Sequence, residues 1–125
     1  MRTDRIDFPR SFQMWAYTVG HAQLLLRSPK STDLPTRIDV LFKNVAAVHL
    51  PTILDGLTIS GATEEEKSEL HVQVGLPRLD GRKVFVVRGS NFIGYVIAGV
   101  VAWHEDEREH YEASHFITTP NDLQQ

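Results

Sequence analysis

The chain has 125 residues, of which 42% are hydrophobic and 23% are charged, a composition typical of a folded globular protein rather than a disordered one. It contains no cysteine, which excludes disulfide bonds, thiolate metal ligands and a cysteine nucleophile. Its formal net charge of -3 gives no general attraction to nucleic acid or to an anionic membrane.

The length suits one independent core, because a chain of this size buries roughly two thirds of its unfolded surface. We therefore expect a single domain over residues 1–125, with flexible ends at 1–10 and 118–125. The longest apolar run, residues 92–103, is well short of the ~20 residues that a membrane-spanning helix needs. The charged N-terminal residues do not resemble a signal peptide. These features predict a soluble, cytoplasmic protein.

Turn signals divide the chain into segments of strand length. Asp55-Gly56 and Asp80-Gly81 each stand between apolar residues and favour type I′ hairpin turns, in which both central residues have positive φ. Residues 88–91 are a third turn candidate, and residues 28–35 are a longer loop.

Between these turns, apolar residues recur mostly at every second position, the spacing of a half-buried strand. We predict strands at residues 11–19, 21–28, 36–43, 45–54, 57–61, 69–76, 83–88 and 91–103. Residues 84–87 and 95–103 are apolar on both faces, which predicts cover on both sides by a helix, a second sheet or another copy of the chain. Gly94 and Gly99 predict a bulge or a bend in the last strand.

Helix signals are few. Thr63 and Glu66 fit a capping box, but the residues that follow lose helical spacing, which predicts one turn or a charged loop. Residues 105–116 fit a polar helix about as well as a strand extension followed by a loop. The predicted fold is mainly β: a small curved antiparallel sheet forming a partly closed barrel or sandwich, with at most one or two short helices.

The predicted N-terminal hairpin carries a distinctive set of side chains. Trp15 and Tyr17 should project from one face, with His21 and Arg27 of the next strand on the same side. Two aromatic rings beside a cation and an imidazole suit a ligand or partner surface. His21 could then act as a general base. We favour the simpler alternative, in which Trp15 and Tyr17 belong to the core and Arg27 pairs with an acidic residue.

Histidines near the C-terminus form a second candidate site. His104, His110 and His115 lie among carboxylates, and two Glu-x-x-His pairs could each present two ligands on one helical face. On a single helix, however, His104 and His115 would stand about 16 Å apart, so one ion could not bind them all. A metal site would need a ligand from elsewhere, such as His49 or His71. We therefore expect a solvated acidic surface, without a metal or other cofactor.

One local feature suggests nucleic acid. Arg78, Arg82, Lys83 and Arg88 cluster around the second Asp-Gly turn, with Phe85 among them, as in barrels that bind single strands. Because the whole chain is acidic and the cluster is short, we favour a solvated hairpin. The sequence has no phosphate-loop, dinucleotide-binding or nucleophile-elbow motif.

Together these patterns favour a non-enzymatic β-rich module that binds another protein or its own copy. A homo-oligomer would cover the strands that are apolar on both faces. The alternative is a small ligand-binding barrel or enzyme that uses His21 with Trp15, Tyr17 and Arg27. A third interpretation is a metal protein that uses the C-terminal histidines.

Overall fold

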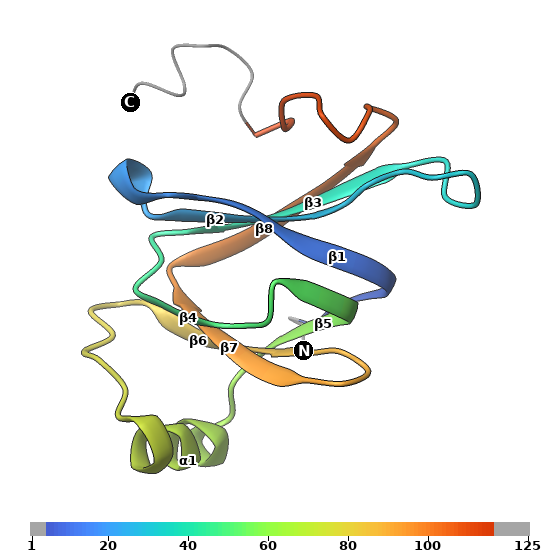
Figure 1. Ribbon diagram of the computed structural model, residues 1–125. Helices are drawn as coiled ribbons and strands as arrows, with labels where there is room; N and C mark the ends of the chain where they lie inside the picture. The colour runs from blue at the N-terminus through green and yellow to red at the C-terminus, as the bar shows by residue number, and fades with distance from the viewer. Residues whose placement is uncertain (1–4, 117–125) are drawn as a thin grey trace.

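The computed structural model describes residues 5–116, which form one antiparallel sheet of eight strands and one α-helix (Figure 1). The strands are β1 (Ile6–Thr18), β2 (Gln23–Ser28), β3 (Arg37–Lys43), β4 (Ala47–His49), β5 (Ile53–Gly61), β6 (Lys83–Arg88), β7 (Ile93–Ala98) and β8 (Val100–Asp106). The helix α1 (Glu64–Val74) lies between β5 and β6, and a 3-10 turn η1 (Val19–His21) connects β1 to β2. The predicted mainly β architecture is confirmed.

The strand order of the sheet is β4-β7-β6-β5-β1-β2-β3-β8. The segments β3–β4 and β7–β8 each have one strand near either end of this order, which brings the two ends together and curls the sheet. β3 pairs with β8, while β4, which follows β3, pairs with β7, which precedes β8. Gly99 separates β7 from β8, as the sequence predicts for a bend, and its N–H donates to the Lys43 carbonyl at 2.8 Å. The Ala46 N–H donates to the Ile97 carbonyl at 2.8 Å. These bonds bridge the bend and give a curled, partly barrel-like sheet.

Apolar side chains from the strands pack together inside the curl. The cluster comprises Phe12, Leu24, Leu26, Ile38, Val40, Phe42, Val45, Leu54, Leu57, Ile59, Phe85, Val87, Val96 and Ala98. Along β5 the buried positions Leu57 and Ile59 alternate with less buried ones, the period expected of a strand with one face in a core. The interior is therefore filled with side chains rather than hollow.

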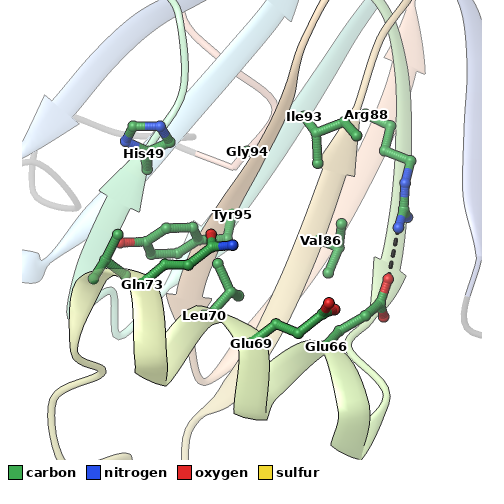
Figure 2. Close-up of a pocket in the computed structure, with 11 residues that line it drawn as sticks. His49, Glu66, Glu69, Leu70, Gln73, Val86, Arg88, Ile93, Gly94 and Tyr95 are labelled. Carbon is green, nitrogen blue, oxygen red and sulfur yellow. Dashed lines mark hydrogen bonds and ion pairs between the residues drawn. The ribbon is translucent and has the colours of Figure 1, made fainter.

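The two strands predicted to need cover on both faces behave differently. In β6, Phe85 and Val87 belong to the core, whereas Val86 on the opposite face lies beneath α1 and is also buried (Figure 2). A helix of the same chain thus supplies the second cover. In β8, Val100 and Trp103 stay 49% and 48% exposed. The prediction of cover on both faces is therefore wrong for the second half of residues 95–103.

The strand predicted at residues 69–76 is wrong, because α1 continues to Val74. Its alternating apolar residues are not a buried face: Val72 is 84% exposed and Val74 is 53% exposed. The capping box at Thr63 starts a full helix rather than one turn, since local helix signals in the acidic first turn outweigh the short alternating pattern.

The two Asp-Gly pairs have different outcomes. Asp55-Gly56 lies inside β5, where Gly56 has φ of 88° opposite the register shift between Phe8 and Ser11 of β1, so the predicted turn there is wrong. The positive φ of Gly56 instead accommodates a bulge-like irregularity in the β1–β5 pairing. Asp80-Gly81 does form a turn with both φ values positive, but it precedes β6 and does not connect two strands.

Other strand boundaries differ from the predicted ones. Strand β1 begins at Ile6, earlier than predicted, and the segment predicted as one strand at 45–54 divides between β4 and β5. Strand β8 ends at Asp106 and is followed by a loop. The predicted flexible tail at 118–125 lies outside the described residues, as do residues 1–4. Within the described part of the chain, the helix is too short to cross a membrane.

Candidate functional site

Helix α1 is fixed at its first turn by side-chain contacts. The Thr63 hydroxyl accepts a hydrogen bond from the Glu66 N–H at 3.1 Å, and the Glu66 carboxylate accepts one from the Thr63 N–H at 2.9 Å. Arg88 of β6 then donates to the other Glu66 oxygen at 2.6 Å. The Thr63 amide, and then Arg88, lower the pKa of the Glu66 carboxyl. This ion pair connects the helix to the sheet.

The side of α1 that faces the sheet is mostly polar. Its residues are Glu66, Glu69, Leu70, Gln73 and Val74, which share one helical face by their i, i+3, i+4, i+7 and i+8 spacing. None of the residues of α1 is buried. Carboxylates and amides cannot be packed dry against apolar side chains without partners, because desolvation costs too much free energy. The helix therefore does not pack closely on the strands.

The result is a pocket of about 400 Å³ between α1 and strands β4, β7 and β6, which we call the helix pocket (Figure 2). Its lining residues are His49, Glu66, Glu69, Leu70, Gln73, Val74, Val86, Arg88, Ile93, Gly94 and Tyr95. The volume lies within the range of small-ligand sites, about 300–1,000 Å³.

An aromatic pair forms one end of the helix pocket on the sheet side. His49 of β4 and Tyr95 of β7 are cross-strand partners, and their rings stack with centroids 5.6 Å apart and planes 17° from parallel. Gly94 permits this close approach, since a Cβ there would lie 2.1 Å from the His49 carbonyl oxygen. Residue 94 must therefore lack a side chain to keep β4 in place.

The charges of the helix pocket do not balance. Glu66 and Arg88 neutralise each other, whereas within residues 5–116 no hydrogen bond or ion pair reaches the Glu69 carboxylate. Figure 2 shows the Glu69 side chain extending from α1 beside the pocket. Glu66, Glu69 and Arg88 together give the pocket one excess negative charge above an apolar surface.

The four residues proposed from the N-terminal hairpin do not converge on one pocket. Arg27 is 1% exposed and donates to both carboxylate oxygens of Asp39, at 2.7 and 3.0 Å, so the predicted acidic partner is confirmed. Trp15 covers the Arg27 guanidinium at 4.8 Å but is itself 39% exposed. Tyr17 is 47% exposed, so the prediction that these two aromatic residues belong to the core is wrong. His21 lies in η1.

Tyr17 instead contributes to a second, apolar pocket of about 310 Å³. The other residues that line this apolar pocket are Met14, Leu24, Val45, Ala46, Ala47 and Val48. Neither the helix pocket nor the apolar pocket includes His21 or Arg27 in its walls. The arrangement expected for a general base beside aromatic residues is therefore not found at these two pockets.

Two of the three candidate histidines near the C-terminus, His104 and His115, lie next to each other. After β8, residues 107–116 fold back, so that the rings of His104 and His115 stack with centroids only 3.7 Å apart. The separation of about 16 Å that holds for a helix does not apply, because the segment is a strand followed by a loop, the other predicted alternative. His110 contacts Tyr111 instead. Among the described residues, no group of three or more His, Cys, Asp or Glu side chains could hold a metal ion.

The segment of residues 107–116 also forms hydrogen bonds with buried arginines of the sheet. Backbone carbonyls of Glu109, Glu112 and Ala113 accept hydrogen bonds from Arg37, and the His110 carbonyl accepts one from Arg27. These bonds use Nη donors of the buried guanidinium groups on β2 and β3 and hold the segment against the sheet. The buried Arg37 Nε has no hydrogen-bond partner and lies 3.5 Å from an Asp106 carboxylate oxygen.

The three arginines of the basic cluster, Arg78, Arg82 and Arg88, have partners within the chain, with Arg78 paired to Asp80 at 3.3 Å. Arg82 donates to the backbone and side-chain oxygens of Asn44, at 2.9 and 3.0 Å, and Arg88 pairs with Glu66. Phe85, the proposed stacking residue, is in the core and is 6% exposed. An aromatic side chain at this position cannot stack on bases.

The helix pocket was missed from sequence because residues 69–76 were assigned to a strand. The signal was present in the capping box and in the spacing of Glu66, Glu69, Leu70 and Gln73. Comparison with protein-family models, curated proteins and solved structures found no match.

Proposed function

We propose that this chain is a non-enzymatic binding module and that its ligand enters the helix pocket. The observation that carries this proposal is the position of α1, an 11-residue helix that lies over the sheet with none of its residues buried. Helices of this length are marginal in water, and most are stabilised by packing an apolar face. Helix α1 instead has polar side chains directed at a pocket of ligand size.

The composition of the pocket walls supports binding with a defined orientation. Val86 and Ile93 supply aliphatic surface on the sheet side, while Glu69 and Gln73 supply polar groups on the helical side next to Leu70. Sites for small ligands and for inserted side chains typically combine an apolar surface with a few polar groups. A ligand between the two sides would also connect α1 to the sheet and stabilise it by mass action.

The test is an NMR titration of ¹⁵N-labelled protein with n-butylamine, phenol, isopropanol and acetate, each added separately. We expect at least one probe to give saturable shifts of amides in α1 and β7. Gln73→Trp should abolish these shifts, because an indole at this position fills the helix pocket.

The matched control is Val72→Trp, which adds the same side chain to the same helix at a residue that is 84% exposed and does not line the pocket. This variant should bind as the native protein does. Probe shifts that persist unchanged in Gln73→Trp, or no saturable shifts in α1 and β7 with any probe, would contradict the proposal.

Self-association is a second candidate function, favoured by the apolar pocket. Tyr17 and Val48 at this pocket are 47% and 36% exposed and would be covered in a dimer. Sedimentation should then show association that strengthens with concentration, and Val48→Glu should shift the protein towards monomer. A native protein that stays monomeric at micromolar and higher concentrations would contradict this candidate.

A further inference from the structure

Resting on the proposed function, we infer that the helix pocket takes an organic cation: a primary ammonium group at the end of an aliphatic stem. The same chemistry occurs in a lysine side chain of a partner and in a free alkylamine. The juxtaposition that leads to this inference is an unpaired carboxylate, Glu69, across from aliphatic and aromatic side chains of the sheet.

The charges of the pocket favour a cation over an anion. Arg88 is the one guanidinium in the lining, and its 2.6 Å ion pair with Glu66 neutralises its charge. An anion would be repelled by the Glu69 carboxylate, and it could reach an unpaired Arg88 charge only by displacing Glu66, which also caps the helix through Thr63. A cation needs no such displacement, since Glu69 has no partner among the described residues. An ammonium group there would form a charge-assisted hydrogen bond.

The other polar groups fit an ammonium group. An ammonium has three N–H donors and needs up to three acceptors. Besides the Glu69 carboxylate, the lining offers the amide oxygen of Gln73 and the hydroxyl of Tyr95. The stacked rings of His49 and Tyr95 add an aromatic surface, which attracts cations placed over a ring face.

The apolar side chains of the helix pocket would contact the aliphatic stem of the ligand. Leu70 on the helix and Val86 and Ile93 on the sheet present aliphatic surface within the same pocket. Ile93 is 71% exposed, so a stem packed on it would remove apolar surface from water. A small hydrated cation would leave this surface uncovered, whereas an alkylammonium would use both the carboxylate and the aliphatic groups.

The experiment compares two probes that differ only by a terminal ammonium group. N-acetyl-lysine methylamide and N-acetyl-norleucine methylamide share an unbranched four-carbon side chain, and only the first ends in an ammonium group. Each is titrated into ¹⁵N-labelled native protein, and n-pentylamine is titrated as the free amine. We expect the lysine probe to shift amides of α1 and β7 saturably, with an affinity about tenfold or more above that of the norleucine probe.

Two charge-matched variants localise the effect. Glu69→Gln should weaken binding of the lysine probe about tenfold and leave the norleucine probe unchanged. Glu65→Gln removes the same charge from the same helix at an exposed residue outside the lining, and should leave both affinities nearly unchanged. Equal losses in the two variants would indicate a general electrostatic effect and would overturn the assignment of Glu69.

The outcomes separate this inference from the proposed function. Equal binding of the lysine and norleucine probes, with shifts confined to the helix pocket, overturns the cation preference while the pocket remains a binding site. No saturable shift in α1 or β7 with the lysine probe or pentylamine also overturns it, and the Gln73→Trp titrations then decide the proposed function independently. If the lysine probe binds more tightly than pentylamine, the source is a side chain of a partner; the reverse order indicates a free amine.

Discussion

Arg27 shows how this fold accommodates a buried charge. Its guanidinium forms two bonds to Asp39 and one of 2.6 Å to the His110 carbonyl, and the Trp15 ring lies over it. Removing Arg27 would leave the buried Asp39 carboxylate with only the more distant Arg37 guanidinium, 3.8 Å away. Arg27 therefore supports the stability of the fold rather than contacting a ligand at either pocket.

The first prediction concerns this ion pair. Arg27→Ala should lower the free energy of unfolding by about 3–5 kcal/mol, because Asp39 is 2% exposed and would lose its bidentate partner. Urea denaturation measures the change. Arg78→Ala is the control, since the Arg78 side chain is 90% exposed and its ion pair with Asp80 should contribute about 0–1 kcal/mol. Equal effects of the two substitutions would refute the structural role of Arg27.

The identity of the partner of Arg27 could not be read from sequence. An acidic partner was predictable from the cost of burying a charge. The choice of Asp39 depends on the β2–β3 register, in which Arg27 lies opposite Asp39. The carbonyl of His110 comes from a loop 83 residues away in the chain, a contact that no local pattern indicates.

At the scale of the element, α1 depends on its N-terminal contacts. Because no helix residue is buried, the capping box and the Glu66–Arg88 ion pair provide contacts that packing does not. Local opening of such an element costs little compared with unfolding of the core.

The second prediction is that Thr63→Ala destabilises α1 by about 1 kcal/mol without a comparable change in the stability of the sheet. The substitution removes the hydroxyl that accepts the Glu66 N–H bond. Hydrogen exchange measured residue by residue should show faster exchange in α1 and unchanged exchange in β2 and β3. A uniform increase over both elements would mean that helix and sheet unfold as one unit.

The third prediction follows from the lowered pKa of Glu66. A carboxyl whose pKa is lower in the folded state than its ordinary 4.5 adds stability that is present above 4.5 and is lost as the pH falls through the folded-state value. Amide protection of α1 should therefore decrease over this acidic interval. Glu66→Gln should remove this component of the pH dependence. An acid-induced loss that is the same in the native protein and in Glu66→Gln would contradict the role of Glu66.

The elements were predictable where one local signal dominated. Strands β2, β3 and β6 match their predicted ranges closely, because alternating or continuous apolar runs ended at clear turn residues. Two signals compete at α1: the apolar alternation at residues 70–76 predicts a strand, whereas the capping box at Thr63 predicts a helix, which the structure has. The sequence Asp55-Gly56 predicts a turn, but the positive φ of Gly56 occurs within β5, because such a φ fits an irregularity in a strand as well as a turn.

At the scale of the whole molecule, a curled sheet with a filled interior carries a helix on its outside. The mainly β class and the bend at Gly99 were predictable from residue patterns. The way in which β3 and β4 pair with β8 and β7 was not, because it depends on contacts between distant segments. The helix pocket has the same origin, since His49, Glu69, Arg88 and Tyr95 come from four separate elements.

The fourth prediction tests the central claim, that the space between α1 and the sheet binds an alkylammonium group. The measurement is of intermolecular NOEs between N-acetyl-lysine methylamide and the native protein. We predict NOEs from the side-chain methylenes of the probe to the methyl groups of Leu70 and Ile93 and to the ring of Tyr95, which line the helix pocket (Figure 2). NOEs to Tyr17 and Val48 of the apolar pocket instead, or none to the helix pocket at saturating probe, would contradict it.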